Sequence, residues 1–239
     1  MNSNTIDSII TQSTAEMGIL LPPQAAAVFG LYYRILAERG KSFNLTALTS
    51  VEDVAHLHFL DSLALTLAFD FKGKNVIDIG SGAGFPGLPL KIADPSICLT
   101  MLDATKKRTD FLLELCAALN IKASCVHARA ETAAHDAGMR EHYDAAVSRA
   151  VARLNILCEL CLPFIRVGGA FLAMKSTGSE DETGQAHTAI EALGAKLSGM
   201  YDYDIPNTSI RHRVVIIRKI SHTPPVYPRR FALIKKKPI

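Results

Sequence analysis

Residues 76–87 read Val-Ile-Asp-Ile-Gly-Ser-Gly-Ala-Gly-Phe-Pro-Gly and decide the fold of this 239-residue chain. The stretch begins with the β-branched apolar run that is typical of a strand buried on both faces of a parallel sheet. Gly80, Gly82 and Gly84 follow, where the backbone can take a positive φ and leaves no Cβ between itself and a ligand. Pro86 suits the first turn of a helix, because its missing N–H would be unpaired there. A strand, a bare turn and a helix N-terminus predict a nucleotide-sized site at the carboxyl edge of an α/β sheet.

The glycine spacing leaves two cofactors open. Gly82, Gly84 and Gly87 also satisfy the dinucleotide pattern G-x-G-x-x-G, so spacing alone does not separate NAD from S-adenosylmethionine. Asp103 closes the next apolar stretch about 20 residues on, where either cofactor would present its ribose hydroxyls to a carboxylate. Asp78 favours S-adenosylmethionine, because a carboxylate there would repel a pyrophosphate but suits a sulfonium and an ammonium group. The alternative role of Asp78 is to cap the loop by accepting hydrogen bonds from its backbone amides.

From residue 74 onward, strand-like and helix-like segments alternate, which predicts a parallel, doubly wound α/β sheet. The expected strands are residues 75–79, 97–102, 122–126, 143–148, 167–174, 197–204 and 212–220, and the expected helices are 86–93, 105–119, 130–137, 152–165 and 182–193. The last two strands are joined by a turn at 206–208 without a helix, so they should pair antiparallel at one end of the sheet. A seven-stranded sheet with one reversed strand favours the Rossmann-like fold of class I S-adenosylmethionine-dependent methyltransferases over a six-stranded dinucleotide fold.

The first 70 residues have helical spacing and lack this alternation, so we expect a helical N-terminal extension packed on the core. Three helices are expected there, beginning near Ile6, at Pro22-Pro23 and at Ser50, the last one running to Leu67. The expected organisation is an extension over 1–70, a methyltransferase domain over 71–221 and a basic C-terminal tail over 222–239.

The composition is that of an ordinary soluble protein, with 49% hydrophobic and 21% charged residues. The longest apolar runs, near 25–33 and 63–69, are shorter than the ~20 residues that span a bilayer, and no signal-peptide pattern is evident. The five cysteines suggest reduced core residues in a cytoplasmic protein. Cys158 and Cys161 form a C-x-x-C, but no second pair stands at zinc-finger spacing. We therefore expect a cytoplasmic monomer with no metal and no membrane contact.

Charge is unevenly distributed along the chain. The net charge is +3, yet from residue 205 onward there are nine Lys or Arg and no Asp or Glu. The first 204 residues therefore carry −6, with 17 basic against 23 acidic residues. A polyanionic partner would explain this excess. Solvated charges on a final strand and a frayed tail would explain it equally well.

Two motifs of other methyltransferases are missing after the fourth strand. One is the [DN]-P-P-[YF] sequence of enzymes that methylate exocyclic amines, and the other is the cysteine of those that act on pyrimidine C5. A nucleophile with a free lone pair, such as guanine N7, needs neither device, because it attacks the methyl group directly once aligned. No general base is therefore expected. Arg149, at the end of the fourth strand, is a candidate positioning residue for the cofactor carboxylate or an RNA phosphate.

Several short stretches resemble the bacterial RsmG (GidB) family of small-subunit rRNA methyltransferases. They are Asn44-Leu45-Thr46, His58-Phe59-Leu60-Asp61-Ser62, residues 78–87, Leu102-Asp103, Ala130-Glu131, Ser148-Arg149-Ala150 and Tyr227-Pro228-Arg229-Arg230. The resemblance covers residues 25–230 in the right order. It implies S-adenosylmethionine-dependent methylation of guanine N7 in the decoding region of 16S rRNA, on the naked rRNA or on the 30S subunit.

Carried over by position, the resemblance implies a set of cofactor contacts: Gly80, Phe85, Ala130, Glu131 and Arg149, with Asp103 on the ribose. The residues themselves add Asp78 and Gly82 to this set. RNA contacts are expected from the tail, at Arg229, Arg230, Lys235, Lys236 and Lys237. The tail departs from the family at residues 231–234, where a Gly-Thr-Pro-like stretch is usual. Asn44, Thr46, His58 and Asp61 either tie the N-terminal helices to the sheet or face the RNA.

Two rival functions use the same loop. An NAD-dependent oxidoreductase would need a hydride-transfer constellation, which is not evident in the sequence. A non-catalytic RNA-binding or ribosome-assembly factor would keep only a relic of the cofactor fold, and the intact Asp78, glycine run and Asp103 argue against this alternative.

Overall fold

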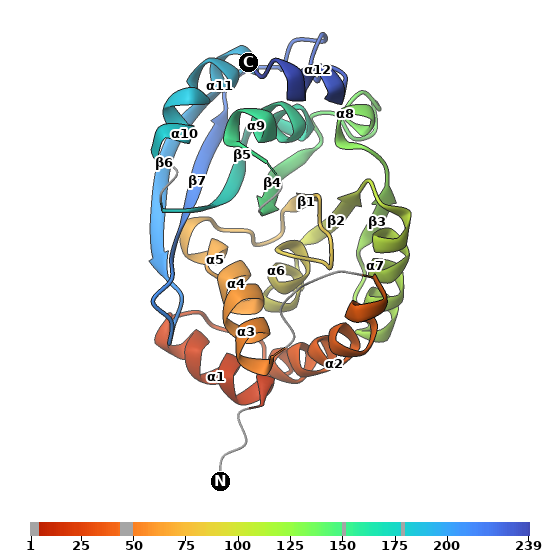
Figure 1. Cartoon of the computed structure of the whole chain (residues 1–239), viewed down its shortest axis with the longest axis vertical. Helices are drawn as coiled ribbons and strands as arrows, with labels where there is room; N and C mark the ends of the chain where they lie inside the picture. The colour runs from red at the N-terminus through yellow and green to blue at the C-terminus, as the bar shows by residue number, and fades with distance from the viewer. Residues whose placement is uncertain (1–4, 44–49, 150–151, 178–179) are drawn as a thin grey trace.

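Seven strands form one sheet in the computed structural model (Figure 1). They are β1 (Asn75–Ile79), β2 (Cys98–Asp103), β3 (Ser124–His127), β4 (Tyr143–Arg149), β5 (Ile165–Ser176), β6 (Ala195–Asp204) and β7 (Arg211–Lys219). The structure describes residues 5–43, 50–149, 152–177 and 180–239. Asn44, Leu45, Thr46 and Ala150 of the family signatures lie outside the described residues.

The strand order is β3-β2-β1-β4-β5-β7-β6. Strands β1 to β5 pair in parallel, whereas β7 pairs antiparallel with both β5 and β6. The prediction of a seven-stranded sheet with one reversed strand is confirmed, and β7 is that strand. The chain runs outward from β1 to β3 and then crosses back to β4. Ligands bind at such switch points, outside the carboxyl ends of the strands.

The helices that follow β1 differ from the expected ones mainly in length. They are α6 (Gly87–Ala93), α7 (Lys106–Ala118), α8 (Ala130–Ala133), α9 (Leu154–Cys161), the 3-10 turn η2 (Leu162–Phe164), α10 (Glu180–Gln185), α11 (His187–Ala192) and α12 (Phe231–Lys236). The helix expected over 152–165 ends early as α9, because Pro163 has no N–H to continue it. The helix expected over 182–193 is two short helices, and the one expected over 130–137 is a single turn.

The N-terminal extension is helical, as predicted. It comprises α1 (Ile6–Glu16), α2 (Ala25–Phe43), α3 (Val51–Val54), the π-helical segment η1 (Ala55–Leu60), α4 (Asp61–Leu63) and α5 (Leu65–Ala68). The single helix expected from Ser50 to Leu67 is therefore interrupted. Ser50 does cap its start, accepting a hydrogen bond from Asp53 N at 3.0 Å. A π-helical turn inside a helix often marks a functional position, and η1 carries His58.

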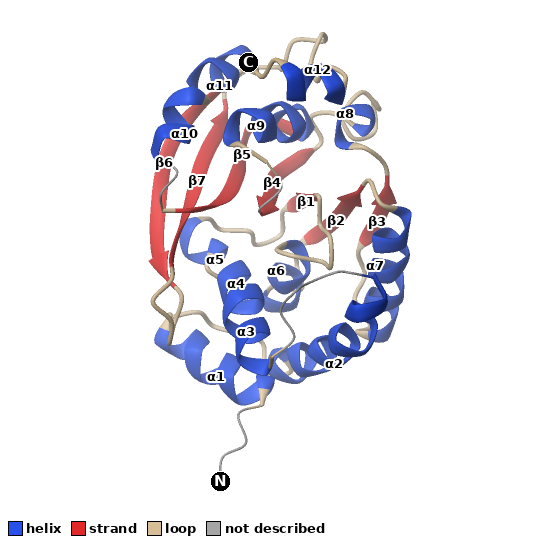
Figure 2. Cartoon of the chain, viewed as in Figure 1, coloured by secondary structure: helices blue, strands red, loops and turns tan. Residues whose placement is uncertain are grey.

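The sheet lies between two helical layers (Figure 2). Side chains of β1 alternate between them: Val76 packs with the N-terminal extension, whereas Ile77 and Ile79 pack with α8, α9, α11 and α12. Phe29, Tyr32 and Phe59 of the extension belong to the same buried cluster as Val76. The extension thus covers one face of the sheet, and Asp78 points toward it because it shares that face with Val76.

The five cysteines differ in their exposure. Cys158 and Cys161 are buried on α9, as predicted. Among the described residues, no group of three or more potential metal ligands occurs. Cys98 is exposed, so the expectation that all five cysteines lie in the core is wrong. Of the helices that the structure describes, none has the length and apolarity needed to cross a membrane.

Candidate active site

The carboxyl ends of β1, β2 and β4 are joined by hydrogen bonds at one edge of the sheet. Gly80 N donates to Leu102 O at 2.8 Å, which fixes the glycine loop to the end of β2. Ser148, fully buried on β4, donates through Oγ to Ile79 O at 3.0 Å. The loop and the two strand tips therefore form one rigid platform at the switch point between β1 and β4.

The three loop glycines differ in what lies beside their backbone. Gly80, Gly82 and Gly84 have φ values of +74°, +57° and +105°. A Cβ on Gly84 would lie 2.6 Å from Tyr32 Oη, so this glycine admits the extension and not a ligand. A Cβ on Gly82 would meet no described atom closer than 3.9 Å, so the backbone faces open space there. Gly82 is thus the position where a ligand can approach the main chain.

Asp78 lies beneath the loop and is fully buried. Its Oδ2 accepts a hydrogen bond from Gly87 N at 2.9 Å, while Oδ1 has no hydrogen-bond partner among the described residues. Burial raises the pKa of Asp78 to about 7. The geometry supports the capping role for Asp78, because the side chain holds the loop from below through Gly87 N. A contact between Asp78 and a cofactor stays a prediction.

The carboxyl end of β2, at Asp103, lies beside the segment that leads into α8. Asp103 Oδ2 accepts from Gly82 N at 3.0 Å and its Oδ1 accepts from Thr105 N at 2.8 Å, with the side chain 3% exposed. The Asp103 carbonyl accepts from Ala128 N at 3.2 Å, two residues before Ala130 and three before Glu131. The Glu131 carboxylate is 11% exposed and accepts from Arg129 Nε at 2.6 Å. Two carboxylates therefore stand at neighbouring strand ends, on the side of the loop away from β4.

Phe85 belongs to an aromatic cluster that the sequence did not predict. Its ring stacks on Tyr32 and on His58, with centroids 5.3 Å and 4.6 Å apart, and Phe59 lies 5.7 Å away. Phe85 itself is only 6% exposed. The ring therefore joins the glycine loop to α2 and η1, and its contact with a cofactor stays a prediction.

Arg149 connects the end of β4 to the extension. Nη1 donates to Leu57 O at 2.9 Å and to Asp61 Oδ2 at 3.1 Å, and the guanidinium lies 5.0 Å above the Phe85 ring. Nη2 lies 3.1 Å from His58 Nδ1, and the same nitrogen lies 3.0 Å from Leu57 O, so Nδ1 either accepts from the guanidinium or donates to the carbonyl. Burial, together with the Arg149 charge, lowers the pKa of His58 to about 4. His58 is therefore neutral at physiological pH.

Asp61 is the centre of this network. It is 3% exposed, and its Oδ1 accepts from Tyr203 Oη at 2.7 Å and from His212 Nδ1 at 2.8 Å. Burial alone would raise the pKa of Asp61, but the hydrogen bond from His212 and the charge of Arg149 lower it. Of the two roles weighed for His58 and Asp61, the contacts support the tie between the extension and the sheet.

A pocket of about 670 Å³ opens beside this network at the carboxyl ends of β4 and β5. It is lined by Leu57, His58, Asp61, Arg149, Ala152, Arg153, Met174, Lys175, Ser176, Glu182 and His212. Lys175 Nζ lies 2.6 Å from Glu182 Oε2 and donates to Ala152 O at 2.8 Å. Lys175 and Glu182 were missed from the sequence, because neither belongs to a motif and only the fold brings β5 and α10 to this edge.

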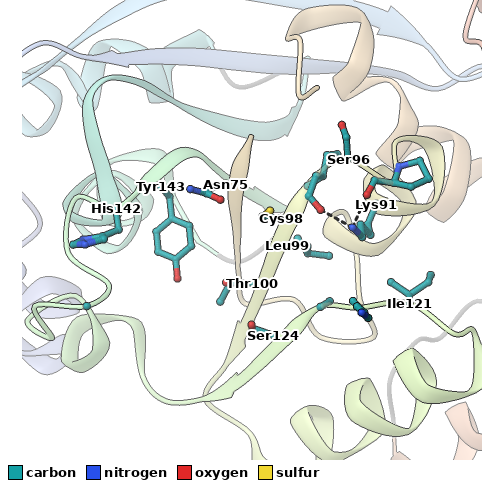
Figure 3. A pocket seen from close by; sticks show the side chains of 15 residues that line it. Asn75, Lys91, Ser96, Cys98, Leu99, Thr100, Ile121, Ser124, His142 and Tyr143 are labelled. Atoms are coloured by element: carbon teal, nitrogen blue, oxygen red, sulfur yellow. Dashed lines mark hydrogen bonds between the residues drawn. The ribbon is translucent and has the colours of Figure 1, made fainter. Parts of the chain in front are cut away.

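A second cavity, of about 740 Å³, lies at the opposite edge of the sheet (Figure 3). It opens at the amino ends of β1, β2 and β3, beside Asn75, Cys98 and Ser124. Lys91 on its wall is already bonded to the carbonyls of Pro95 and Ile97, at 2.7 Å and 2.6 Å. None of the predicted cofactor residues lines this cavity, so it is not the active site.

The basic C-terminal region is folded, which overturns the interpretation of a frayed tail. Arg229 Nε and Nη2 donate to the two carboxylate oxygens of Glu159 at 2.8 Å and 2.6 Å, and Arg229 N donates to Oε1 at 2.8 Å. Glu159 is fully buried on α9, and Ile234 of α12 is buried as well. The Arg229 guanidinium therefore pairs with a buried carboxylate, and we no longer assign Arg229 to RNA binding.

Part of the apparent basic excess is also neutralised within the protein. Three further cations of the last 35 residues pair with acids, namely Arg211 with Asp204, Arg213 with Asp202 and Lys219 with Glu141. The exposed cations of the C-terminal segment are Arg230, Lys235, Lys236 and Lys237. Sequence counting therefore overstated the charge that this end of the chain offers to a partner.

The sheet order with its reversed β7, the glycine loop after β1 and the acid at the tip of β2 define a class I S-adenosylmethionine-dependent methyltransferase. Solved structures share this fold. A SAM-dependent methyltransferase from Aquifex aeolicus matches with a TM-score of 0.54 at 13% identity, covering 76% of this chain and 97% of that one. TYW2 of M. jannaschii in complex with AdoMet matches with a TM-score of 0.51 at 15% identity, covering 65% and 74%.

Sequence relatives narrow the class to one family. The family model described as rRNA small subunit methyltransferase G, GidB, matches residues 26–210. The chain is 42% identical over 232 residues to the ribosomal RNA small subunit methyltransferase G of Pelotomaculum thermopropionicum, covering 96% of this chain and 97% of that one. It is 40% identical over 231 residues to the protein of that name from Bacillus subtilis, with the same coverage. The chain belongs to the rRNA small subunit methyltransferase G family.

Proposed function

We propose that this chain transfers the methyl group of S-adenosylmethionine to guanine N7 in the decoding region of 16S rRNA. The observation that carries the proposal is the meeting of the Gly82 backbone, Asp103 and Glu131 at one edge of the sheet, beside a pocket that contains cations. Family membership supplies the substrate class, since the relatives are named for the RNA of the small ribosomal subunit. Neither an NAD-dependent oxidoreductase nor a non-catalytic assembly factor has support among these relatives.

The described residues fit this cofactor. Asp103 is assigned to the ribose hydroxyls, the backbone at Gly80 and Gly82 to the methionine portion, and Ala130 and Glu131 to the adenosine side. The open space above Gly82 leaves room for a ligand against the loop. When bound, S-adenosylmethionine supplies an electrophilic methyl group on a sulfonium. Asp78, buried below the loop, holds its conformation through Gly87 N.

The residues near the pocket suit a reaction without proton abstraction. Guanine N7 is a neutral nitrogen with a free lone pair, so the protein needs only to align it with the methyl carbon and the sulfur. His58 Nδ1 lies against Arg149 and the Leu57 carbonyl, and Asp61 accepts from three donors. Both are occupied as structural groups, which agrees with a mechanism that has no general base. Arg149 acts as a positioning residue by holding the loop and the extension in one arrangement.

We assign RNA phosphate binding to the exposed cations of α12 and its start. Four cations, Arg230 and Lys235–Lys237, engaged on single-stranded or loop RNA give a slope of log K against log salt of roughly −3. Replacing the three lysines by glutamine should reduce the slope by about 2 without disturbing buried Ile234. An unchanged slope would remove α12 from the RNA-binding surface.

The proposal includes a monomeric, cytoplasmic protein that acts on the naked 16S rRNA or on the assembled 30S subunit. The test is transfer of a tritiated methyl group to each of these substrates, isolated from cells that lack the activity, followed by mapping of the modified base. Label at N7 of one guanosine supports the proposal, and the faster of the two substrates identifies the partner. Label on another atom, or on neither RNA, contradicts it.

A further inference from the structure

The pocket at the ends of β4 and β5 has the size and position of a base-binding subsite. Its volume of about 670 Å³ is typical of small-molecule sites. It adjoins the glycine loop, because Arg149 on its wall lies above the Phe85 ring of that loop. Enzymes that modify a base act on single-stranded substrate or take the base out of its stack, and they read its Watson–Crick edge by hydrogen bonds in such a pocket.

Glu182 is the one carboxylate of the pocket wall that is not fully engaged among the described residues. Asp61 accepts three hydrogen bonds and is 3% exposed, whereas the Glu182 side chain is 31% exposed. Both contacts of Glu182 use Oε2: Leu154 N donates to it at 3.1 Å, and Lys175 Nζ lies 2.6 Å away. For Oε1, the described part of the chain provides no hydrogen-bond donor. One oxygen thus fixes the side chain and the other is left for a ligand.

A carboxylate at this position distinguishes guanine from the other bases. Guanine presents two adjacent, nearly parallel donors, N1–H and the N2 amino group, which the open Oε1 can accept together. Adenine places an acceptor, N1, beside its amino group and would be repelled. N1 and N2 lie on the side of the purine opposite N7, so a base held by Glu182 on α10 turns N7 away from α10. Arg149 and His58 also line the pocket, and the His58 ring stacks on Phe85 of the glycine loop.

We propose that Glu182 selects guanine by accepting hydrogen bonds from N1–H and the N2 amino group, with Lys175 holding the carboxylate in place. This inference rests on the proposed function and names the specificity residue for it. A purely structural role is the alternative, since Glu182 also accepts the first free N–H of α9 and pairs with β5. Loss of activity on mutation would not separate the two roles, so the test must vary the base as well.

The experiment compares 16S rRNA that carries guanosine or inosine at the methylated nucleotide, because inosine lacks only the N2 amino group. Wild-type protein should show a kcat/KM about 10- to 100-fold lower for inosine, the effect of losing one hydrogen bond to a charged acceptor. Glu182→Ala should lower kcat/KM for guanosine and bring the guanosine-to-inosine ratio to within about 3-fold. Glu191→Ala, an exposed acid on α11, is the matched control and should keep the wild-type ratio.

Two further measurements keep the outcome decisive. Calorimetry of S-adenosylmethionine binding should give the same Kd for Glu182→Ala and wild type, which shows that the fold and the cofactor site are intact. If the alanine variant is unstable, Glu182→Gln, which retains the shape, should show the same collapse of the ratio. A wild-type ratio near one, or a variant that keeps the wild-type ratio, overturns the role of Glu182. Failure of the wild type to methylate guanosine at N7 would instead overturn the proposed function.

Discussion

Replacing Arg229 by methionine tests whether the C-terminal segment is held by an internal ion pair. The substitution leaves the carboxylate of Glu159 buried on α9 after removing the two guanidinium hydrogen bonds of 2.8 Å and 2.6 Å. Removal of one partner of a buried pair costs about 3–5 kcal/mol. The 19% exposure of the Arg229 side chain puts the expected loss toward the lower end of that range. For a chain of this length the corresponding fall in Tm is roughly 6–20 °C.

The assay is urea unfolding at pH 7 with a parallel thermal scan, and Arg230→Met serves as the adjacent control. Arg230 is exposed, so its replacement should change the unfolding free energy by less than about 0.5 kcal/mol. RNA binding should respond in the opposite way: Arg230→Met should reduce the salt slope by about 0.7, whereas Arg229→Met should leave it unchanged. The reasoning is refuted if Arg229→Met is as stable as wild type and flattens the slope.

Three further perturbations test the site and its supports. Asp61→Asn should destabilise the protein by about 3 kcal/mol in urea unfolding, whereas Asp110→Asn, which removes an exposed ion pair on α7, should cost under about 1 kcal/mol. Equal effects of the two substitutions would show that the Asp61 network does not stabilise the fold. Burial raises the pKa of Glu141 but its hydrogen bonds lower it to about 2, so its contribution to stability is present above about pH 4.5 and is lost as the pH falls toward 2. Glu141→Gln should flatten the pH dependence of Tm in that interval, and a curve parallel to wild type would contradict this. Gly84→Ala should lower Tm more than Gly82→Ala does, because its Cβ would lie 2.6 Å from a buried tyrosine hydroxyl. Gly82→Ala should instead cause the larger loss of S-adenosylmethionine affinity in calorimetry, and the reverse order of affinities would place the ligand elsewhere.

The sheet could be predicted from the sequence because its signals are local. Each strand of the parallel part is a short apolar run that ends at a glycine, an acid or a polar residue, and β1 and β2 end within one residue of the expected positions. The glycine loop and Asp103 are likewise local features, since topology alone brings the ends of neighbouring parallel strands to one edge. Asp78 could not be placed as firmly, because its side of the strand depends on what covers the sheet.

The contacts that the sequence missed join residues far apart in the chain. Asp61 meets Tyr203 and His212 across 142 and 151 positions, and Arg229 meets Glu159 across 70. Lys219 looks like a solvated charge on a final strand, yet it is 1% exposed. Such pairs leave no periodic pattern, because each partner alone has the composition of an exposed polar site.

The most direct test of the central claim is calorimetry of cofactor binding. We predict that the protein binds one S-adenosylmethionine per chain and gives no heat with NAD. Asp103→Ala should raise the Kd at least about 10-fold, the effect of losing a charged hydrogen-bond acceptor, whereas Asp110→Ala on the exposed face of α7 should leave it unchanged. Binding of NAD in place of S-adenosylmethionine, or an Asp103→Ala variant with wild-type affinity, would contradict the account.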